Sequence, residues 1–140
     1  MVIVRNFVEI DCRRLIMKVL VVDDFATMRK IIKNVLKQIN IENVVEAENG
    51  RHALDVLNKE DIDLIISDWI MPEMTGIDFL KACKGDDKIK NIPFLMVTAE
   101  AQKDCILEAI KSGVDNYIVK PFTPEKLQGA IDKARAKISK

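Results

Sequence analysis

The chain has 140 residues, an apolar fraction of 49% and a charged fraction of 31%, values typical of one globular domain with a buried core. Basic and acidic side chains both number 22, so no overall charge favours nucleic acid or an anionic membrane. The apolar runs are far shorter than the roughly 20 residues that span a bilayer and the start lacks a signal-peptide pattern, so we expect a cytoplasmic protein.

Three cysteines, Cys12, Cys83 and Cys105, lie far apart in the chain. Their odd number and the lack of a Cys-x-x-Cys pair argue against a disulfide framework or a structural zinc site. We expect all three thiols to be reduced.

The first 16 residues mix Val and Ile with scattered charges and carry no turn or helix-cap signal. Met17 precedes an apolar run and is the natural start of a domain. We therefore predict an N-terminal extension over 1–16 and a folded domain over 17–140. An upstream start codon, an added segment and a genuine extra strand remain open for the extension.

From Lys18 onward, short apolar runs alternate with segments of helical period. The run 19–22 predicts a strand. The segment 25–39 predicts a helix that packs on a sheet, because its apolar residues recur at i, i+3 and i+4. This stripe consists of Met28, Ile31, Ile32, Val35, Leu36 and Ile39.

A second strand is predicted over 44–47, and Asn49-Gly50 marks a turn or a helix entry. The helix that follows buries a face made of Ala53, Leu54 and Leu57. The segment 63–67, with the apolar residues 64–66 at its centre, predicts the third strand.

Residues 71–76 must form a loop, because Pro72 cannot donate to a strand ladder and Gly76 tolerates positive φ. A third helix is predicted over 77–84. Pro93 then permits only the first position of a fourth strand over 94–97.

The last third of the chain predicts a fourth helix over 101–112, with Gly113 in the left-handed position that ends many helices. The fifth strand is predicted over 117–119. Thr123 suits a helix N-cap with Pro124 at the first helical position. The apolar side of this last helix carries Leu127, Ala130, Ile131, Ala134 and Ile138.

Five consecutive strand–helix units with short joints predict an α/β fold. Right-handed crossovers place helices on both faces of a parallel sheet, so we expect a doubly wound three-layer sandwich. An eight-stranded barrel needs a much longer chain. Ligands of doubly wound sheets bind outside the carboxyl ends of the strands.

Polar residues stand at the ends of four of these strands. Parallel strands present their carboxyl ends on one edge, so residues nearly a hundred positions apart would meet there. Taken singly, each is equally a turn former or a solvated strand end. The four strand ends carry Asp23-Asp24 after 19–22, Asp68 after 64–67, Thr98 after 94–97 and Lys120 after 117–119.

Together, these residues predict a site for a divalent cation and a phosphoryl group. Adjacent Asp23 and Asp24 are costly unless a cation shares them, and Mg²⁺ prefers hard oxygen ligands. Asp68 can be a further ligand and a nucleophile that forms an acyl phosphate. Lys120 and Thr98 can bind the phosphoryl oxygens.

The motifs around these residues resemble the receiver domain of two-component response regulators, and most closely the stand-alone CheY-like chemotaxis regulators. The likeness covers 18–138 in unbroken order and implies a flavodoxin-like sheet of strand order 2-1-3-4-5. It assigns the receiver domain to 17–140. The motifs are Val21-Val22-Asp23-Asp24, Ser67-Asp68-Trp69-Ile70-Met71-Pro72, Val97-Thr98-Ala99-Glu100 and Val119-Lys120-Pro121-Phe122.

The resemblance implies that Asp68 accepts a phosphoryl group from a phosphohistidine of a sensor kinase. It implies Mg²⁺ bound by Asp23, Asp24 and Asp68, and Thr98 and Lys120 as the residues that respond to phosphorylation. It also implies a cis peptide bond between Lys120 and its proline, which the sequence permits.

The resemblance gives Tyr117 the role of a switching aromatic, although it is equally a half-buried ring with a wet hydroxyl. Trp69 would border the site. His52, the only histidine, is expected on the surface outside the cluster. The partner-binding face would include Lys103, Ile106, Tyr117 and Val119.

One residue departs from the chemotaxis pattern, in which an amide commonly stands two positions after the acceptor. This chain has Ile70, which cannot orient the water that hydrolyses the phosphoryl group. We expect slow autodephosphorylation, with Glu100 as the remaining polar neighbour.

These features predict a phosphorylation-driven switch that acts through partners and is not an enzyme acting on external substrates. The expected partners are a CheA-like sensor histidine kinase, a flagellar motor switch protein or another protein target, and a phosphatase. A phosphorelay intermediate and a kinase-regulating receiver are alternatives within this class.

Two other classes fit less well. A Mg²⁺-dependent aspartyl-phosphate hydrolase requires an acid–base aspartate where Ile70 stands, and a capping insertion that the chain lacks. A flavodoxin-type mononucleotide binder requires a Gly-rich loop after the first strand, and no such loop follows the strand 19–22.

Overall fold

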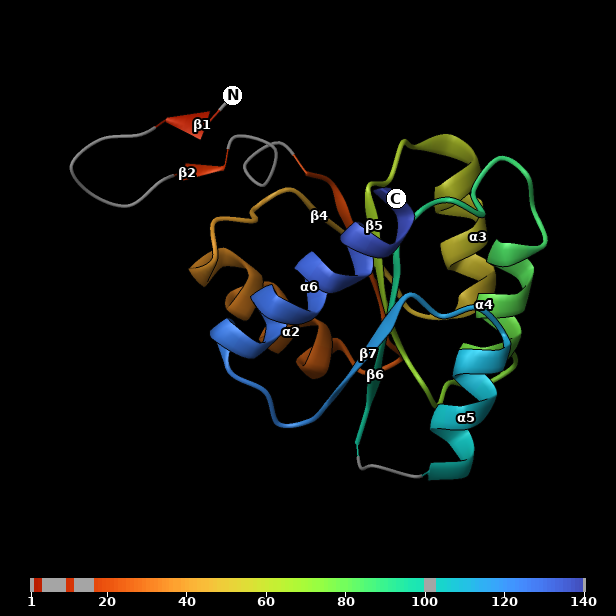
Figure 1. Ribbon diagram of the computed structural model, residues 1–140. Coiled ribbons are helices and arrows are strands. Elements are labelled where there is room, and N and C mark those ends of the chain that lie inside the picture. Colours follow the sequence, from red (N-terminus) through yellow and green to blue (C-terminus); the bar gives the residue numbers. More distant parts are fainter. Residues whose placement is uncertain (1, 4–9, 12–16, 100–102, 140) are drawn as a thin grey trace.

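Five parallel strands form the central sheet of the computed structural model, which describes residues 2–3, 10–11, 17–99 and 103–139 (Figure 1). The order along the sheet is β4-β3-β5-β6-β7, which confirms the predicted 2-1-3-4-5 arrangement. The strands are β3 (Val19–Val22), β4 (Val44–Ala47), β5 (Leu64–Asp68), β6 (Phe94–Thr98) and β7 (Asn116–Val119).

Helices cover both faces of this sheet and complete the predicted three layers (Figure 1). Helices α2 and α6 lie on one face, and α3, α4 and α5 lie on the other. Their bounds are α2 (Ala26–Gln38), α3 (Gly50–Lys59), α4 (Gly76–Lys84), α5 (Lys103–Lys111) and α6 (Pro124–Ser139).

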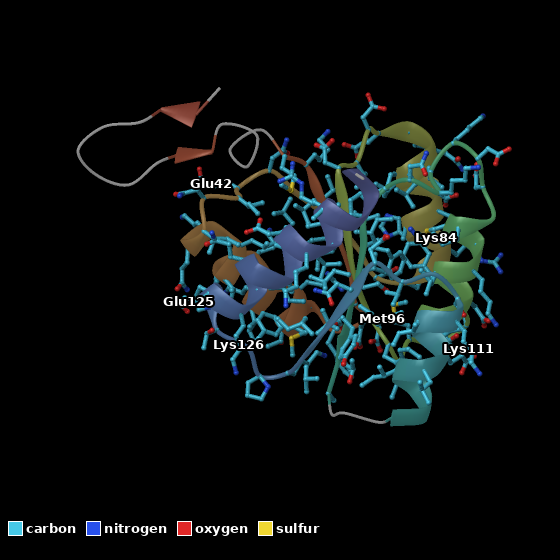
Figure 2. All side chains as sticks on the ribbon, viewed as in Figure 1. Glu42, Lys84, Met96, Lys111, Glu125 and Lys126 are labelled. Carbon is cyan, nitrogen blue, oxygen red and sulfur yellow. The ribbon has the colours of Figure 1, made fainter. Side chains whose placement is uncertain are left out.

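The two faces of the sheet bury two separate cores, because successive strand residues point to opposite sides. Val19 and Val21 pack with α2 and α6, whereas Leu20 and Val22 pack beneath α3 and α4. Figure 2 shows the contrast between core and surface at single residues. Met96 lies inside the fold and is fully buried, whereas Lys111 points outward from α5.

Most predicted elements agree with the structure to within one or two residues. The third strand is displaced by one residue, since β5 ends at Asp68 and not before it. Asn49 is a helix entry, because its side chain accepts a hydrogen bond from the His52 N–H. Gly113 has a φ of +94°, and Thr123 accepts from the Lys126 N–H at 3.2 Å, as predicted for their caps.

One member of the predicted apolar stripe on α2 was wrong. Ile31 is 46% exposed, whereas Ile32 and Leu36 are buried. Successive helix residues are about 100° apart, so Ile31 falls outside the arc that faces the sheet. The buried face of α3 likewise includes Val56, which the prediction omitted, while Leu54 is only half-buried.

The described residues within 1–16 form a sheet of their own. β1 (Val2–Ile3) and β2 (Ile10–Asp11) pair antiparallel and add no strand to the five-stranded sheet. Over the described ranges, no helix is long and apolar enough to cross a membrane.

Cys83 is a free thiol in the core under α4, and burial raises its pKa to about 12. It therefore packs as an unreactive apolar side chain. The predictions for Cys12, for the side chain of Cys105 and for residues 101 and 102 of the fourth helix concern parts outside the described residues.

Candidate functional site

The sheet register brings the predicted polar residues to one edge. β3 and β5 pair with Val22 opposite Ser67, so Asp23 and Asp68 follow side by side. The Trp69 N–H donates to the Val97 carbonyl at 3.1 Å, and the Lys120 N–H donates to the Thr98 carbonyl at 2.7 Å. The ends of β3, β5, β6 and β7 therefore meet, as the sequence predicted.

Three carboxylates gather at this edge. One oxygen each of Asp23, Asp24 and Asp68 lies within 4.8 Å of the others. Asp23 Oδ2 and Asp24 Oδ1 are buried and have no hydrogen-bond partner among the described residues. Buried polar atoms without partners are costly, and oxygen atoms in this arrangement suit a hard divalent cation. The donor set therefore fits the predicted metal site.

Lys120 places a positive charge beside these carboxylates. Its Nζ lies 3.3 Å from Asp68 Oδ1 and 3.9 Å from Asp23 Oδ2. The Lys120–Pro121 peptide bond is cis, in agreement with the resemblance. The ammonium group offsets part of the negative charge and leaves the cluster net negative.

Burial raises the pKa of Asp23 and the pKa of Asp68 above the ordinary value of 3.8. For Asp23, a hydrogen bond of 2.9 Å from the Phe25 N–H opposes this rise in pKa. For Asp68, the Lys120 ammonium is the largest opposing influence on the pKa. The ionised carboxylates are thus poorly solvated, a state that a bound cation relieves.

A cavity of about 380 Å³ opens beside the cluster. Asp24, Asp68, Thr98 and Lys120 contribute its polar lining. Exposed apolar side chains border it, since Phe25 is 67% exposed and Ile70 is 71% exposed. The remaining lining residues are Trp69, Met71, Pro72 and Ala99.

The loop after β5 turns tightly to hold the Asp68 backbone. The Gly76 N–H donates to the Trp69 carbonyl at 2.8 Å. A Cβ at Gly76 would lie 2.4 Å from the Asp68 carbonyl oxygen, so this close approach requires glycine. Thr75 then caps α4 by accepting from the Asp78 N–H at 3.1 Å.

The residues predicted for a partner-binding face lie away from this cavity. Tyr117 and Val119 are half-buried on β7 and line a separate groove beside α6. Ile106 is half-buried on α5. Lys103 begins α5, but its side chain lies outside the described part, as does the whole of Glu100.

His52 is exposed on α3 and lies outside the acidic cluster, as predicted. Phe25 at the mouth of the cavity was not predicted as a site residue. The available signal was its position directly after the paired aspartates. Arg29, which donates to the Asp23 carbonyl at 2.7 Å, was also missed, because no sequence pattern indicates this contact.

Comparisons with known proteins agree with this geometry. The family model of the response regulator receiver domain matches residues 19–132. The chain is 50% identical over 117 residues to the chemotaxis protein CheY of Pseudomonas aeruginosa. The aligned region covers 84% of this chain and 94% of that protein. The identity to CheY-3 of Vibrio cholerae is also 50%, over 84% of this chain and 90% of that protein.

Solved structures show the same likeness. CheY4 of Vibrio cholerae superposes with a TM-score of 0.77 at 37% identity, covering 84% of this chain and 98% of the other. A response regulator receiver domain protein of Clostridium thermocellum gives a TM-score of 0.78 at 28% identity, covering 89% and 98%. The fold, the clustered motifs and these similarities establish that the chain belongs to the response regulator receiver family.

Proposed function

We propose that this receiver is a phosphorylation-driven switch in chemotaxis, with Asp68 as the phosphoacceptor and Mg²⁺ as the metal. One observation carries the proposal. Carboxylate oxygens of Asp23, Asp24 and Asp68 lie within 4.8 Å of one another, and the Lys120 ammonium lies 3.3 Å from Asp68. This is the arrangement that a metal-assisted transfer to a carboxylate requires.

Asp68 would act as the nucleophile towards a phosphohistidine of a sensor histidine kinase. Its Oδ1 accepts hydrogen bonds from the Trp69 N–H at 2.9 Å and from Lys120 at 3.3 Å. These bonds fix the carboxylate and leave Oδ2 for attack. An Oδ2–P bond forms as the P–N bond to the imidazole breaks, and the bond's electron pair returns to the imidazole nitrogen.

Mg²⁺, held by Asp23, Asp24 and Asp68, would offset the charge on the phosphoryl oxygens. Lys120 would pair with one of those oxygens. The hydroxyl of Thr98, which lines the same cavity, would bind another. Ile70 and Glu100 would set the rate at which water removes the phosphoryl group.

The output would be binding to another protein, without turnover of external substrates. Phosphorylation of Asp68 would add negative charge beside Thr98. The resulting movement of Thr98 would change the position of Tyr117 on the neighbouring strand β7. The face that changes would include Lys103, Ile106, Tyr117 and Val119. Its occupant would be a flagellar motor switch protein or a comparable target.

The similarity to chemotaxis proteins supports a CheA-like kinase as the phosphoryl donor. A dedicated phosphatase is a further expected partner. This role would place the protein in the cytoplasm. We also propose that 17–140 is the receiver unit and 1–16 an extension to it, because the family match begins at residue 19 and buried Met17 packs with the core.

The decisive experiment is incubation with acetyl phosphate and Mg²⁺, followed by intact-mass measurement. A single adduct should form in the parent protein and in Asp87→Asn, whose side chain is 93% exposed. The adduct should be absent from Asp68→Asn and from samples with EDTA. Multiple turnover of varied phosphate esters would favour a hydrolase instead, and no adduct would refute the proposal.

The partner part of the proposal needs a separate test. The protein should capture a motor switch protein in a pull-down when beryllium fluoride and Mg²⁺ are present, and not without them. Capture that is unaffected by beryllium fluoride would contradict switching.

A further inference from the structure

Arg29 forms a clamp between the acidic cluster and strand β4. Its Nη1 donates to the Asp23 carbonyl oxygen at 2.7 Å, and its Nε lies 2.9 Å from Glu46 Oε1. The other oxygen of Glu46 lies 3.0 Å from Lys33 Nζ. The Arg29 side chain is only 16% exposed, so the guanidinium is fixed between two acceptors.

This clamp acts on the turn that carries the paired aspartates. The Asp23 N–H donates to the Ala47 carbonyl at 3.1 Å, which fixes one side of the residue. Arg29 fixes the other side through the Asp23 carbonyl. The turn leads directly into α2, whose N-cap residue Phe25 makes no side-chain capping bond. Arg29 therefore supplies a tether at a helix start that lacks the usual cap.

We propose that Arg29 is a positioning residue for the metal site, because its guanidinium holds the Asp23–Asp24 turn in the conformation that directs both carboxylates to one cation. The inference rests on the proposed function, since it assumes that the acidic cluster binds Mg²⁺. Arg29 makes its contact with a backbone oxygen of this turn and would act through the aspartates.

The charge of Arg29 and its position predict opposite effects of its removal on Mg²⁺ binding. A cation beside a metal site repels the metal, so a purely electrostatic role would make Mg²⁺ binding tighter when Arg29 is removed. Glu46 neutralises much of that charge at 2.9 Å. Loss of the clamp should therefore weaken Mg²⁺ binding, and the direction of the change separates the two roles.

The test uses Arg29→Met, Arg29→Lys and the matched control Lys33→Met. Lys33 carries the same charge on the same helix and lies 3.0 Å from the same Glu46, but it pairs with that carboxylate and not with the Asp23 carbonyl. Mg²⁺ affinity is measured through the fluorescence of Trp69, the only tryptophan, which lines the cavity. Thermal unfolding without Mg²⁺ checks that each variant is folded.

We expect Arg29→Met to weaken Mg²⁺ binding about 5- to 10-fold, in line with the net contribution of one hydrogen bond of ordinary strength. Arg29→Lys should weaken it roughly 3-fold, because one ammonium reproduces the two-pronged geometry poorly. Lys33→Met should stay within about 2-fold of the parent. With acetyl phosphate, the Mg²⁺ concentration for half-maximal phosphorylation should rise in Arg29→Met while the plateau rate stays within about 2-fold.

Unchanged or tighter Mg²⁺ binding in Arg29→Met overturns the inference, as does an equal loss in Lys33→Met. If Arg29→Met does not fold, Arg29→Lys decides, and parent-like affinity in that variant is then the contrary result. A parent protein that binds no Mg²⁺ overturns the proposed function together with this inference. If the parent binds Mg²⁺ and the Arg29 variants bind it with the same affinity, only this inference is overturned.

Discussion

Lys120 Nζ lies 3.3 Å from Asp68 Oδ1 and 3.9 Å from Asp23 Oδ2. One ammonium group thus contacts the proposed phosphoacceptor and approaches a proposed metal ligand. It stabilises both ionised carboxylates when no metal is present. The same group competes with a divalent cation for them, so its removal should affect metal binding and switching in different ways.

Lys120→Met should tighten Mg²⁺ binding roughly 3- to 10-fold, because a competing positive charge is removed from a partly buried site. The change in Trp69 fluorescence that beryllium fluoride produces should be lost. Mg²⁺ titration with and without beryllium fluoride measures both effects. Lys126→Met, which removes an exposed lysine on α6, is the control. Weaker Mg²⁺ binding in Lys120→Met would contradict this role.

Asp23→Asn should stabilise the metal-free protein at pH 7 by about 1–3 kcal/mol, because it removes a buried negative charge whose Oδ2 has no hydrogen-bond partner among the described residues. The pKa of Asp23 is raised in the folded state, so its ionisation opposes folding. Below the ordinary pKa of 3.8 the carboxyl is protonated in both states, and this difference is small. The parent loses stability relative to the variant as pH rises from there through the raised pKa.

Urea unfolding in EDTA at about pH 3.5 and pH 7 measures this difference. Mg²⁺ at pH 7 should stabilise the parent more than Asp23→Asn. The exposed Asp87→Asn should change stability by less than about 0.5 kcal/mol at either pH. An Asp23→Asn variant that is less stable than the parent at pH 7 without Mg²⁺ would disprove the account.

Ile70→Asn should speed autodephosphorylation about 3- to 10-fold, less than the roughly 100-fold of a full general base. Ile70 is 71% exposed and lines the cavity, so an amide there can orient an attacking water without repacking the core. Decay of the adduct after removal of acetyl phosphate gives the rate. Ile31→Asn, at an exposed isoleucine on α2, should leave the rate unchanged. Equal decay in Ile70→Asn and the parent would refute the assignment.

Gly76→Ala should weaken Mg²⁺ binding and phosphorylation at least several-fold and destabilise the protein by about 1–3 kcal/mol. The added Cβ would lie 2.4 Å from the Asp68 carbonyl oxygen, so the loop after β5 must move. Gly129→Ala is the matched control, because its Cβ would meet nothing within 4 Å. That change lies inside α6 and should stabilise the protein by up to about 1 kcal/mol. Chemical denaturation and Mg²⁺ titration check both variants, and parent-like behaviour of Gly76→Ala would show that the loop tolerates a side chain.

The sequence was most informative where a local pattern had one physical interpretation. Buried strands such as 19–22 and 94–97 were visible as short, wholly apolar runs, because strands covered on both faces need no polar alternation. Gly113 and Thr123 were identified as helix caps for equally local reasons. Ile31 and Ile32 are adjacent and both fit the helical spacing, so periodicity predicted the helix correctly but assigned Ile31 to the wrong face.

The sequence by itself determined the alternation of strands and helices and the polar residue that ends each of four strands, since both depend on neighbours along the chain. Only the tertiary structure decided that three aspartate oxygens lie within 4.8 Å, that Lys120 reaches Asp68, and that Arg29 reaches the Asp23 carbonyl. These contacts depend on strand register and on how α2 packs against the sheet. Register and packing arise from the balance of many distant interactions, and no single segment of the sequence carries them.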